Sequence, residues 1–443
     1  MLYNVQFSQS HLLKSPQGQE IQRLFGITEE ELTDQVVVPP SEIQLGQITY
    51  ITGLSGSGKS TLLRQIQKKH TDAFWVKREI DESLTPIEFL GAETSEALSW
   101  LTRFGLGEAF LMLKPVYQLS DGQKFRLQLA KSMYQQQNCM ILCDEFLSLV
   151  DRQTSQVIAY NVQKICRRQN IQLVVATAHR DLQSSLIPDV VIRMDLNGVL
   201  SVDEDKGVNW QAPLFSKEDL KIERGEIDDY FQFQRFHYSK GDDDKLIRSD
   251  LLDHVVVARY GELTIGVALI TKPFPKTLES IPLFAEINQS IKVSERVVIH
   301  PSFRGCGITK LLQPMVSGEV KYIFSQSAFG LKVNFKSVSQ FQEVEHPNKK
   351  RNEPWQEYLH KSEHENVTEK ELQSLLVQAA VLKRKRYLHF FIQLLKKELA
   401  DHEVQFVDLL LSHVQRDLQN WPEAQLIEEA RPFPMAAFLK KLL

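Results

Sequence analysis

A glycine-rich loop near the start of the chain has the residue types and the spacing needed to hold phosphate groups. It reads Gly-Leu-Ser-Gly-Ser-Gly-Lys-Ser-Thr over residues 53–61, after the apolar run 48–52 and before Leu62-Leu63-Arg64. A strand, such a loop and a helix start, in that order, let backbone N–H groups surround a phosphate. The residues expected to contact nucleotide phosphates are Gly53, Ser55, Gly56, Ser57, Gly58, Lys59, Ser60 and Thr61.

Four side chains have more specific predicted roles in phosphate chemistry. Lys59 is expected to reach the outer phosphates, and the Ser60 hydroxyl is expected to bind Mg²⁺. Asp144 and Glu145 follow a second apolar run, 140–143. Asp144 is placed to lie in the outer shell of the metal, and Glu145 to polarise an attacking water. Many strands end in acidic residues, so this pair indicates a catalytic site only in combination with the phosphate loop.

A segment between these two sites resembles the signature of a known family. Residues 119–123 read Leu-Ser-Asp-Gly-Gln, close to the LSGGQ signature of ABC ATPases, and residues 124–130 resemble the helix that follows it there. Residues 148–151 resemble the D-loop of that family. His179, after the apolar run 173–176, resembles its switch histidine. The motifs stand in the order that the family has.

The resemblance implies ATP hydrolysis by a homodimer whose ATPase domains meet head to tail. Ser120 and Gly122 of one subunit would close on ATP that is held by Lys59 of the other. Gln123 and Asp151 belong to the same implied nucleotide-binding set, and His179 would contact the γ-phosphate as a catalytic residue.

One departure from the family concerns the length of chain between two motifs. Only 61 positions separate Lys59 from Ser120, fewer than transporter ATPases usually have. No Q-loop glutamine and no aromatic residue that stacks on adenine can be assigned. The short insertion fits a soluble ABC protein better than a transporter subunit.

A second strand, turn and helix start occupies residues 297–312. It resembles motif A of GNAT acetyltransferases, in which backbone N–H groups hold the pyrophosphate of acetyl coenzyme A. Arg304 and Gly307 match the motif and Gly305 lies between them, whereas Thr309 replaces its small last residue. The resemblance covers about residues 215–345 and implies acetyl coenzyme A as a second cofactor beside ATP and Mg²⁺.

No residue of this second region is marked as a catalytic base by its sequence alone. Glu295, just before the motif strand, is a candidate to take a proton from an acceptor amine, and a solvated acid at a strand end is the alternative. An aromatic cluster could line the acceptor site or pack an amphipathic helix: Phe231, Phe233, Phe236, His237 and Tyr238.

The pattern of apolar residues predicts the fold class. The three short apolar runs named above are typical of buried parallel strands separated by helices. Runs at 255–260 and 264–270 around Gly261 predict an antiparallel hairpin, and the period after residue 366 is helical. We expect an α/β chain with an ABC-type ATPase domain at 1–210, an α+β GNAT-like domain at 211–365 and a helical C-terminal region at 366–443.

Composition narrows the classes of protein to consider. The 443 residues are 42% hydrophobic and 24% charged, with a net charge of -4, so attraction to nucleic acid would have to come from local patches. The sparse cysteines argue against a disulfide framework. A signal-peptide pattern and an apolar stretch of membrane-spanning length are absent from the sequence. These features predict a cytoplasmic protein that makes no contact with a membrane.

Basic residues gather toward the C-terminus. Residues 346–400 contain 11 Lys or Arg against 7 Asp or Glu, with clusters at 349–351 and 383–386. Tyr387 and His389 stand beside the second cluster, so DNA or RNA is one predicted partner. A solvated helix face is the alternative explanation.

Three functions remain open from the sequence. In the first, the ABC dimer gates or positions an acetyl coenzyme A site whose acyl acceptor is unknown and could be nucleic acid. In the second, an ATPase of nucleic-acid maintenance carries a GNAT-like domain that binds without catalysis. In the third, a GNAT-like domain modifies nucleobases with a different donor.

Overall fold

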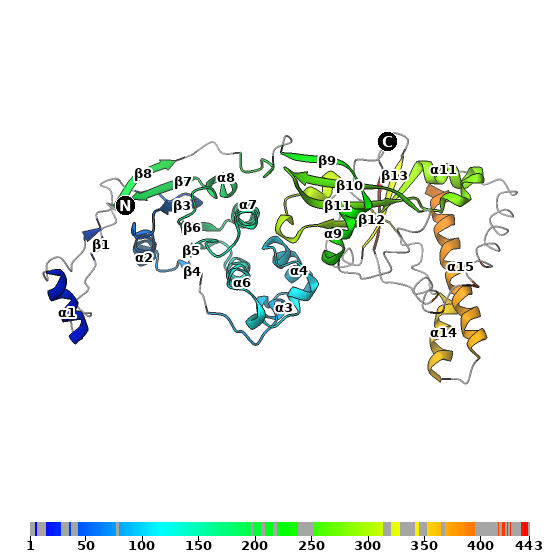
Figure 1. The fold of residues 1–443 in the computed structure, drawn as a ribbon, viewed down its shortest axis with the longest axis horizontal. Coiled ribbons are helices and arrows are strands. Elements are labelled where there is room, and N and C mark those ends of the chain that lie inside the picture. Colours follow the sequence, from blue (N-terminus) through cyan, green and yellow to red (C-terminus); the bar gives the residue numbers. More distant parts are fainter. Residues whose placement is uncertain are drawn as a thin grey trace. The chain divides into compact units, whose positions relative to one another are not determined.

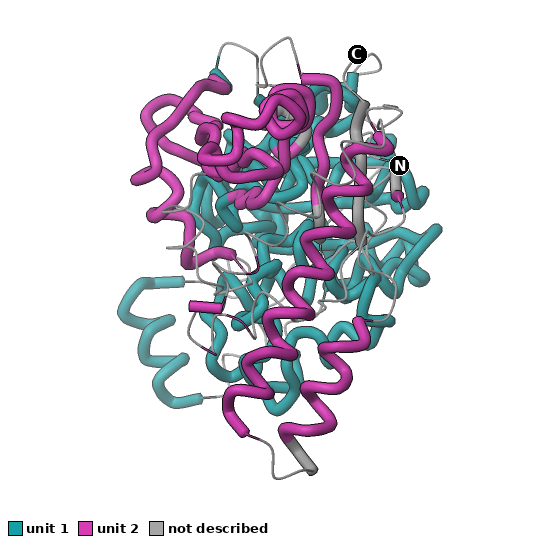
Figure 2. Tube along the Cα trace, turned by 90° about the vertical axis from the view of Figure 1, so that its right-hand side faces the viewer, with its two compact units in different colours: residues 1–220, 300–308 teal, residues 221–299, 309–443 magenta. Residues whose placement is uncertain are grey.

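The computed structural model divides the chain into two compact units, which Figure 2 shows in two colours. The first unit contains residues 1–220 and 300–308, and the second contains 221–299 and 309–443. Compact units need not coincide with folding domains, so the three predicted domains remain a prediction. The structure describes residues 5–6, 15–27, 35–36, 43–76, 79–195, 198–204, 209–215, 219–237, 251–312, 320–327, 342–344, 352–364, 368–394, 415, 419–420, 423, 426 and 436–441.

A six-stranded sheet is the centre of the first unit, in the order β4-β5-β6-β3-β7-β8. Neighbouring strands are parallel from β4 to β7, and β8 returns antiparallel to β7. The three apolar runs predicted as parallel strands are β3, β5 and β6, which confirms that prediction. The strands are β3 (Ile48–Gly53), β4 (Phe74–Trp75), β5 (Met140–Cys143), β6 (Gln172–Thr177), β7 (Val190–Asp195) and β8 (Gly198–Glu204), with β1 (Val5–Gln6) and β2 (Gln35–Val36) as a separate pair.

Alternate residues of the central strands face two apolar layers. In β5, Ile141 and Cys143 pack in one layer, while Met140 and Leu142 pack in the other. Side chains alternate across a strand, so a strand that is covered on both faces has a continuous apolar sequence instead of an alternating one. This double burial explains why the runs were recognisable in the sequence.

Helices cover both faces of this sheet (Figure 1). Helix α2 contributes apolar side chains to one layer, and α6 and α7 contribute to the other. A short 3-10 turn, η2 (Val116–Gln118), precedes α6. The helices of the first unit are α1 (Pro16–Phe25), α2 (Lys59–Lys69), α3 (Pro86–Leu90), α4 (Thr94–Arg103), α5 (Ala109–Met112), α6 (Asp121–Gln135), α7 (Arg152–Arg168) and α8 (Gln183–Leu186).

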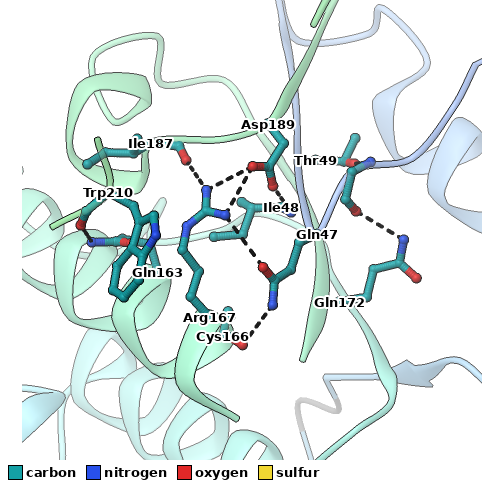
Figure 3. A network of polar contacts seen from close by, with 11 residues as sticks. Gln47, Ile48, Thr49, Gln163, Cys166, Arg167, Gln172, Ile187, Asp189 and Trp210 are labelled. Atoms are coloured by element: carbon teal, nitrogen blue, oxygen red, sulfur yellow. Dashed lines mark hydrogen bonds and ion pairs between the residues drawn. The ribbon is translucent and has the colours of Figure 1, made fainter. Parts of the chain in front are cut away.

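A polar network around Arg167 ties α7 to the amino edge of the sheet (Figure 3). The Arg167 guanidinium donates from Nη1 and Nη2 to Asp189 Oδ1, at 3.0 Å each, and from Nη2 to the carbonyl oxygen of Ile187 at 2.8 Å. Asp189 Oδ2 accepts the N–H of Ile48 at 2.7 Å. One carboxylate therefore joins the last turn of α7 to the first residue of β3.

A seven-stranded mixed sheet is the centre of the second unit, in the order β14-β15-β13-β12-β11-β10-β9. The predicted hairpin is β10 and β11, which pair antiparallel around Gly261. Strand β12 pairs antiparallel with β11 and parallel with β13. The strands are β9 (Leu220–Gly225), β10 (Leu252–Tyr260), β11 (Leu263–Thr271), β12 (Ile291–Ile299), β13 (Tyr322–Ser327), β14 (Gln342–Val344) and β15 (Ala436–Lys441).

Helix α15 is part of the apolar core of the second unit. Its residues Leu388, Phe391 and Ile392 pack with Phe284 of α11 and Phe324 of β13. Figure 1 shows α14 and α15 side by side, and they share a second apolar cluster. The helices and 3-10 turns are α9 (Ile227–Phe233), η3 (Gln234–Phe236), η4 (Lys276–Ser280), α11 (Pro282–Ser290), η5 (Pro301–Phe303), α12 (Ile308–Leu312), α14 (Glu353–His364) and α15 (Glu369–Leu394).

Among the described residues of the C-terminal region, one segment is a strand and not the expected helix. Residues 436–441 form β15, which pairs antiparallel with both β13 and β14. The segment reads Ala-Ala-Phe-Leu-Lys-Lys, without the alternation of apolar and polar residues that reveals a strand, and its partners lie far away in sequence. None of the helices in the described part of the chain combines the length and the apolar character needed to cross a membrane.

We predict that Asp189→Ala lowers the free energy of unfolding by about 2–3 kcal/mol, because it leaves the N–H of Ile48 without its acceptor and the shielded Arg167 guanidinium without its carboxylate partner. Urea denaturation followed by circular dichroism measures the change. The exposed Glu79 supplies the control Glu79→Ala, which should shift the midpoint little. Equal midpoints for the two variants would show that the network does not stabilise the sheet.

Candidate nucleotide-binding site

The phosphate loop connects β3 to α2, as its sequence predicted. Lys59 is the first residue of α2, and its side chain folds back into the loop. Its Nζ donates to the carbonyl oxygens of Gly53 at 3.0 Å and Leu54 at 2.7 Å. Lys59 is only 7% exposed, so these carbonyls compensate for the loss of water around the ammonium group. The loop thus holds a buried positive charge at the start of a helix.

Two glycines of the loop are required by the backbone. A Cβ atom on Gly53 would lie 2.1 Å from the carbonyl oxygen of Met194 in β7, much closer than two such atoms can approach. Gly58 precedes α2 with a φ of 88°, in the left-handed region that favours glycine. Gly53 allows the loop to approach the sheet, and Gly58 allows the chain to change direction at the start of α2.

The loop has the donors that a phosphate group needs. The Ser57 residue is 3% exposed, and its buried hydroxyl has no hydrogen-bond partner within the described residues. A buried hydroxyl without a partner is costly. Together with the N–H groups of the first turn of α2 and the ammonium of Lys59, this hydroxyl fits a bound phosphate. Ser60 lies in the first turn of α2 and is partly exposed.

The two predicted acids follow β5 in a constrained turn. Glu145 has a φ of 52°, an uncommon conformation for a residue with a side chain and one that concentrates at functional sites. Its N–H donates to Asp144 Oδ1 at 3.0 Å, and its Oε2 accepts from the Ser148 hydroxyl at 2.7 Å. Glu145 is exposed while Asp144 is half-buried. The turn therefore presents one carboxylate to solvent and fixes its direction.

His179 follows β6, which lies between β3 and β5 in the sheet. Its backbone is held from both sides: its N–H donates to Thr177 Oγ1 at 3.2 Å, and its carbonyl oxygen accepts from the Tyr50 hydroxyl. Burial, with a smaller contribution from Asp181, raises the pKa of Tyr50 far above its ordinary value. Tyr50 therefore keeps its proton and remains a donor at neutral pH. The His179 residue itself is exposed.

The signature residues stand at the start of α6 and contact the D-loop. Ser120 is the N-cap: its Oγ accepts the N–H of Gln123 at 3.3 Å, and its own N–H donates to Gln123 Oε1 at 3.0 Å. A Cβ atom on Gly122 would lie 2.5 Å from the carbonyl oxygen of Leu149. Asp151 caps α7 by accepting the N–H of Thr154 at 2.9 Å. The signature and the D-loop are therefore packed together.

The three residues predicted to bind acetyl coenzyme A lie in one unit, and the candidate catalytic base lies in the other. Arg304, Gly305 and Gly307 lie in the segment 300–308 of the first unit, whereas Glu295 lies in β12 of the second. Gly305 and Gly307 have φ values of 87° and 83°. A Cβ atom on Gly305 would meet Asn161 at 2.6 Å, whereas one on Gly307 would meet nothing within 4 Å. Only the second glycine therefore leaves open space.

Glu295 and the aromatic cluster have local partners. Arg296 Nη1 lies 3.4 Å from Glu295 Oε1. Phe233 is buried against β10 and β11, with its ring 6.0 Å from that of Phe236, while Phe231 is 40% exposed. Packing therefore explains two of the three phenylalanines. His237 is buried, and Tyr238 lies outside the described residues.

The basic cluster 383–386 lies within α15, where all four residues are half-buried. The Tyr387 ring packs 6.1 Å from that of Phe324 and 6.2 Å from that of Phe391. This ring therefore packs against the apolar core of the second unit and is partly buried. His389 is exposed, and residues 349–351 lie outside the described part of the chain.

Two polar side chains that contact the end of α4 were missed by sequence reasoning. Arg126 lies on α6 beside Gly122, and Asn161 lies on α7 beside Gly305. Both donate to backbone carbonyls, which any residue provides. A partner of this kind leaves no pattern in the sequence, so no signal could have identified them.

Comparison with known proteins finds ATP-binding relatives for part of the chain. It is 26% identical over 177 residues to the leukotoxin translocation ATP-binding protein LktB of Mannheimia haemolytica, which covers 31% of this chain and 24% of that protein. It is 26% identical over 182 residues to the methionine import ATP-binding protein MetN of Latilactobacillus sakei, covering 32% and 51%. The chain thus spans only a quarter to a half of these two relatives. No model of a protein family matches it.

Solved structures align with part of the chain at low TM-scores. The dimeric structure of MJ0796, a bacterial ABC transporter cassette, aligns with a TM-score of 0.33 and 20% identity over 40% of this chain and 93% of that chain. A post-hydrolysis state of the same cassette, bound to ADP and Pi, gives a TM-score of 0.32 and 19% identity over 40% and 94%.

Proposed function

We propose that this chain, whose first unit has the motifs of an ABC-type ATPase domain, binds ATP with Mg²⁺ and hydrolyses it as a head-to-tail homodimer. One observation carries the proposal. The phosphate loop follows β3, Asp144 and Glu145 follow β5, and His179 follows β6, and these three strands are parallel neighbours. Their carboxyl ends share one edge of the sheet, where open α/β sheets bind their ligands.

The groups at this edge can perform ATP hydrolysis. The N–H groups at the start of α2 and Lys59 bind the phosphates, and Ser60 and Asp144 would hold Mg²⁺, which neutralises phosphate charge. Glu145 accepts a hydrogen bond from the attacking water, whose oxygen forms a bond to the γ-phosphorus while its proton passes to an oxygen of the phosphate product. The bond between that phosphorus and the β–γ bridging oxygen breaks, and ADP and phosphate leave. Ser148 keeps the Glu145 carboxylate in position meanwhile.

A second candidate activity, acyl transfer from acetyl coenzyme A, is supported by the sheet of the second unit. Strands β12 and β13 pair in parallel only from Ile291 with Tyr322 to Ser294 with Ser325, although β12 continues to Ile299. Parallel strands that part at their carboxyl ends leave backbone N–H and C=O groups for a ligand. Glu295 is the first residue of β12 beyond the pairing. Nucleic acid is one predicted acyl acceptor.

We predict that Glu145→Gln leaves ATP affinity within about twofold and lowers hydrolysis by at least about 100-fold, since only the polarising carboxylate is lost. Lys59→Ala should instead weaken ATP binding itself. Calorimetry and phosphate release measure the two quantities. Glu79→Gln is the control at an exposed acid. Hydrolysis by the Glu145 variant at the parent rate would refute the assignment of this residue.

We predict that mixing Ser120→Arg chains with Lys59→Ala chains restores activity that neither has alone. A mixed dimer contains one composite site with both halves intact, so random exchange should give about a quarter of the parent rate if sites act independently. Cross-linking of tagged chains must show that mixed dimers form. Recovery of no activity in such dimers would argue against the head-to-tail arrangement.

We predict that Gly307→Asp abolishes binding of acetyl coenzyme A to the full chain, because it adds a negative charge where a pyrophosphate is expected. Gly261→Asp is a matched control, since Gly261 also has a positive φ, of 57°, with nothing within 4 Å of its Cβ position. Calorimetry decides between the outcomes. Binding that persists in Gly307→Asp, or that is absent in the parent, would count against acyl transfer.

A further inference from the structure

The turn 103–107, which ends α4, presents four carbonyl groups to side chains from distant parts of the chain. Arg126 Nη1 donates to the carbonyl oxygens of Phe104 at 3.3 Å and Gly105 at 3.0 Å. Arg304 Nη1 donates to that of Gly107 at 2.5 Å. The carbonyl end of a helix carries partial negative charge, so two guanidinium groups are well matched to this turn.

Arg126 connects this turn to the signature. It lies in the second turn of α6, and its Nε donates to the carbonyl oxygen of Gly122 at 3.2 Å. Burial lowers the pKa of the Arg126 guanidinium, while the charges of Asp151 and Glu108 oppose that effect. A buried guanidinium held by three carbonyl groups has little freedom to move. The position of α6 is therefore tied to the position of the turn.

Arg304 is held as firmly on the other side of the turn. Asn161 Nδ2 donates to the carbonyl oxygens of Arg103 at 2.9 Å and Arg304 at 3.2 Å, so one amide bridges the turn and the segment 300–308. The Phe303 ring is buried 5.9 Å from that of Phe215. Burial lowers the pKa of the Arg304 guanidinium, opposed by the charge of Glu108. The segment is thus built into the first unit.

We propose that Arg304 is a positioning residue for the proposed ATPase: it fixes the turn 103–107, and through Arg126 it fixes the signature at the start of α6. The inference rests on the proposed function for its catalytic consequence, although the positioning itself is independent of nucleotide. It gives this arginine a task other than gripping the pyrophosphate of a second cofactor. The assignment of Arg304 leaves the predicted role of Gly307 unchanged, because the Cβ position of Gly307 lies in open space.

Hydrogen exchange of the full-length, nucleotide-free protein tests the positioning. Arg304→Ala should accelerate exchange of the amides of 103–107 and 121–125 by about tenfold, the effect of losing one hydrogen bond from a charged group. Exchange in α2 should not change. Arg304→Lys, which keeps a charge and a donor for Gly107, should restore most of the protection. Arg224→Ala removes an exposed arginine from β9 and is the matched control.

Steady-state kinetics of the same variants tests the catalytic consequence. Arg304→Ala should lower kcat about tenfold while the KM for ATP stays within about twofold, because the signature acts on ATP that the partner's loop already holds. The double variant Arg126→Ala/Arg304→Ala should have a kcat close to that of the more impaired single variant. The two effects should not add, because both residues act through one turn.

The outcomes separate this inference from the proposed function. Unchanged exchange in 103–107 and 121–125 of Arg304→Ala would overturn the positioning role, whatever the parent hydrolyses. A parent protein without ATPase activity would refute the proposed function, while the exchange data would still decide the positioning role. Accelerated exchange throughout the first unit, without rescue by Arg304→Lys, would also overturn it by showing a general loss of stability.

Discussion

Parallel pairing of β3, β5 and β6 is the constraint on which the candidate site depends. Parallel neighbours end at the same edge of a sheet, so segments that follow residues 53, 143 and 177 must meet there although the chain separates them widely. The pairing is maintained by burial of both faces, which excludes water from the strand hydrogen bonds. The positions of the candidate site residues at the carboxyl ends of the strands therefore depend on packing against both faces of the sheet. The Arg167 network stabilises the amino ends of the strands.

The sequence was informative where a residue's task requires a particular residue type. Only glycine tolerates the approach of Met194 to Gly53, and only a long cation can fold back into the loop as Lys59 does. Doubly buried strands likewise leave a continuous apolar run. These features allowed the α/β class, the central strands and the residues of the phosphate loop to be predicted without coordinates.

Other features depend on partners that carry no sequence pattern. Asn161 and Arg304 are 143 positions apart, and Arg304 and Gly107 are 197 apart, yet each contact uses a backbone carbonyl. The residue types of the turn 304–307 suit both a bound pyrophosphate and packing against Asn161. The motif alone therefore does not predict which groups contact this turn. Strand β15 similarly acquires its conformation from β13 and β14.

The first unit is discontinuous, because residues 300–308 complete a body that otherwise ends at Leu220. A ribosome makes a chain from its N-terminus, at about 5–20 residues per second. The turn 103–107 must then wait for almost two hundred further residues before Arg304 emerges. During that interval the carbonyl of Gly107 lacks its Arg304 donor, and Arg126 alone of the two arginines contacts the turn. The first unit therefore reaches its final form only after β12 has been synthesised.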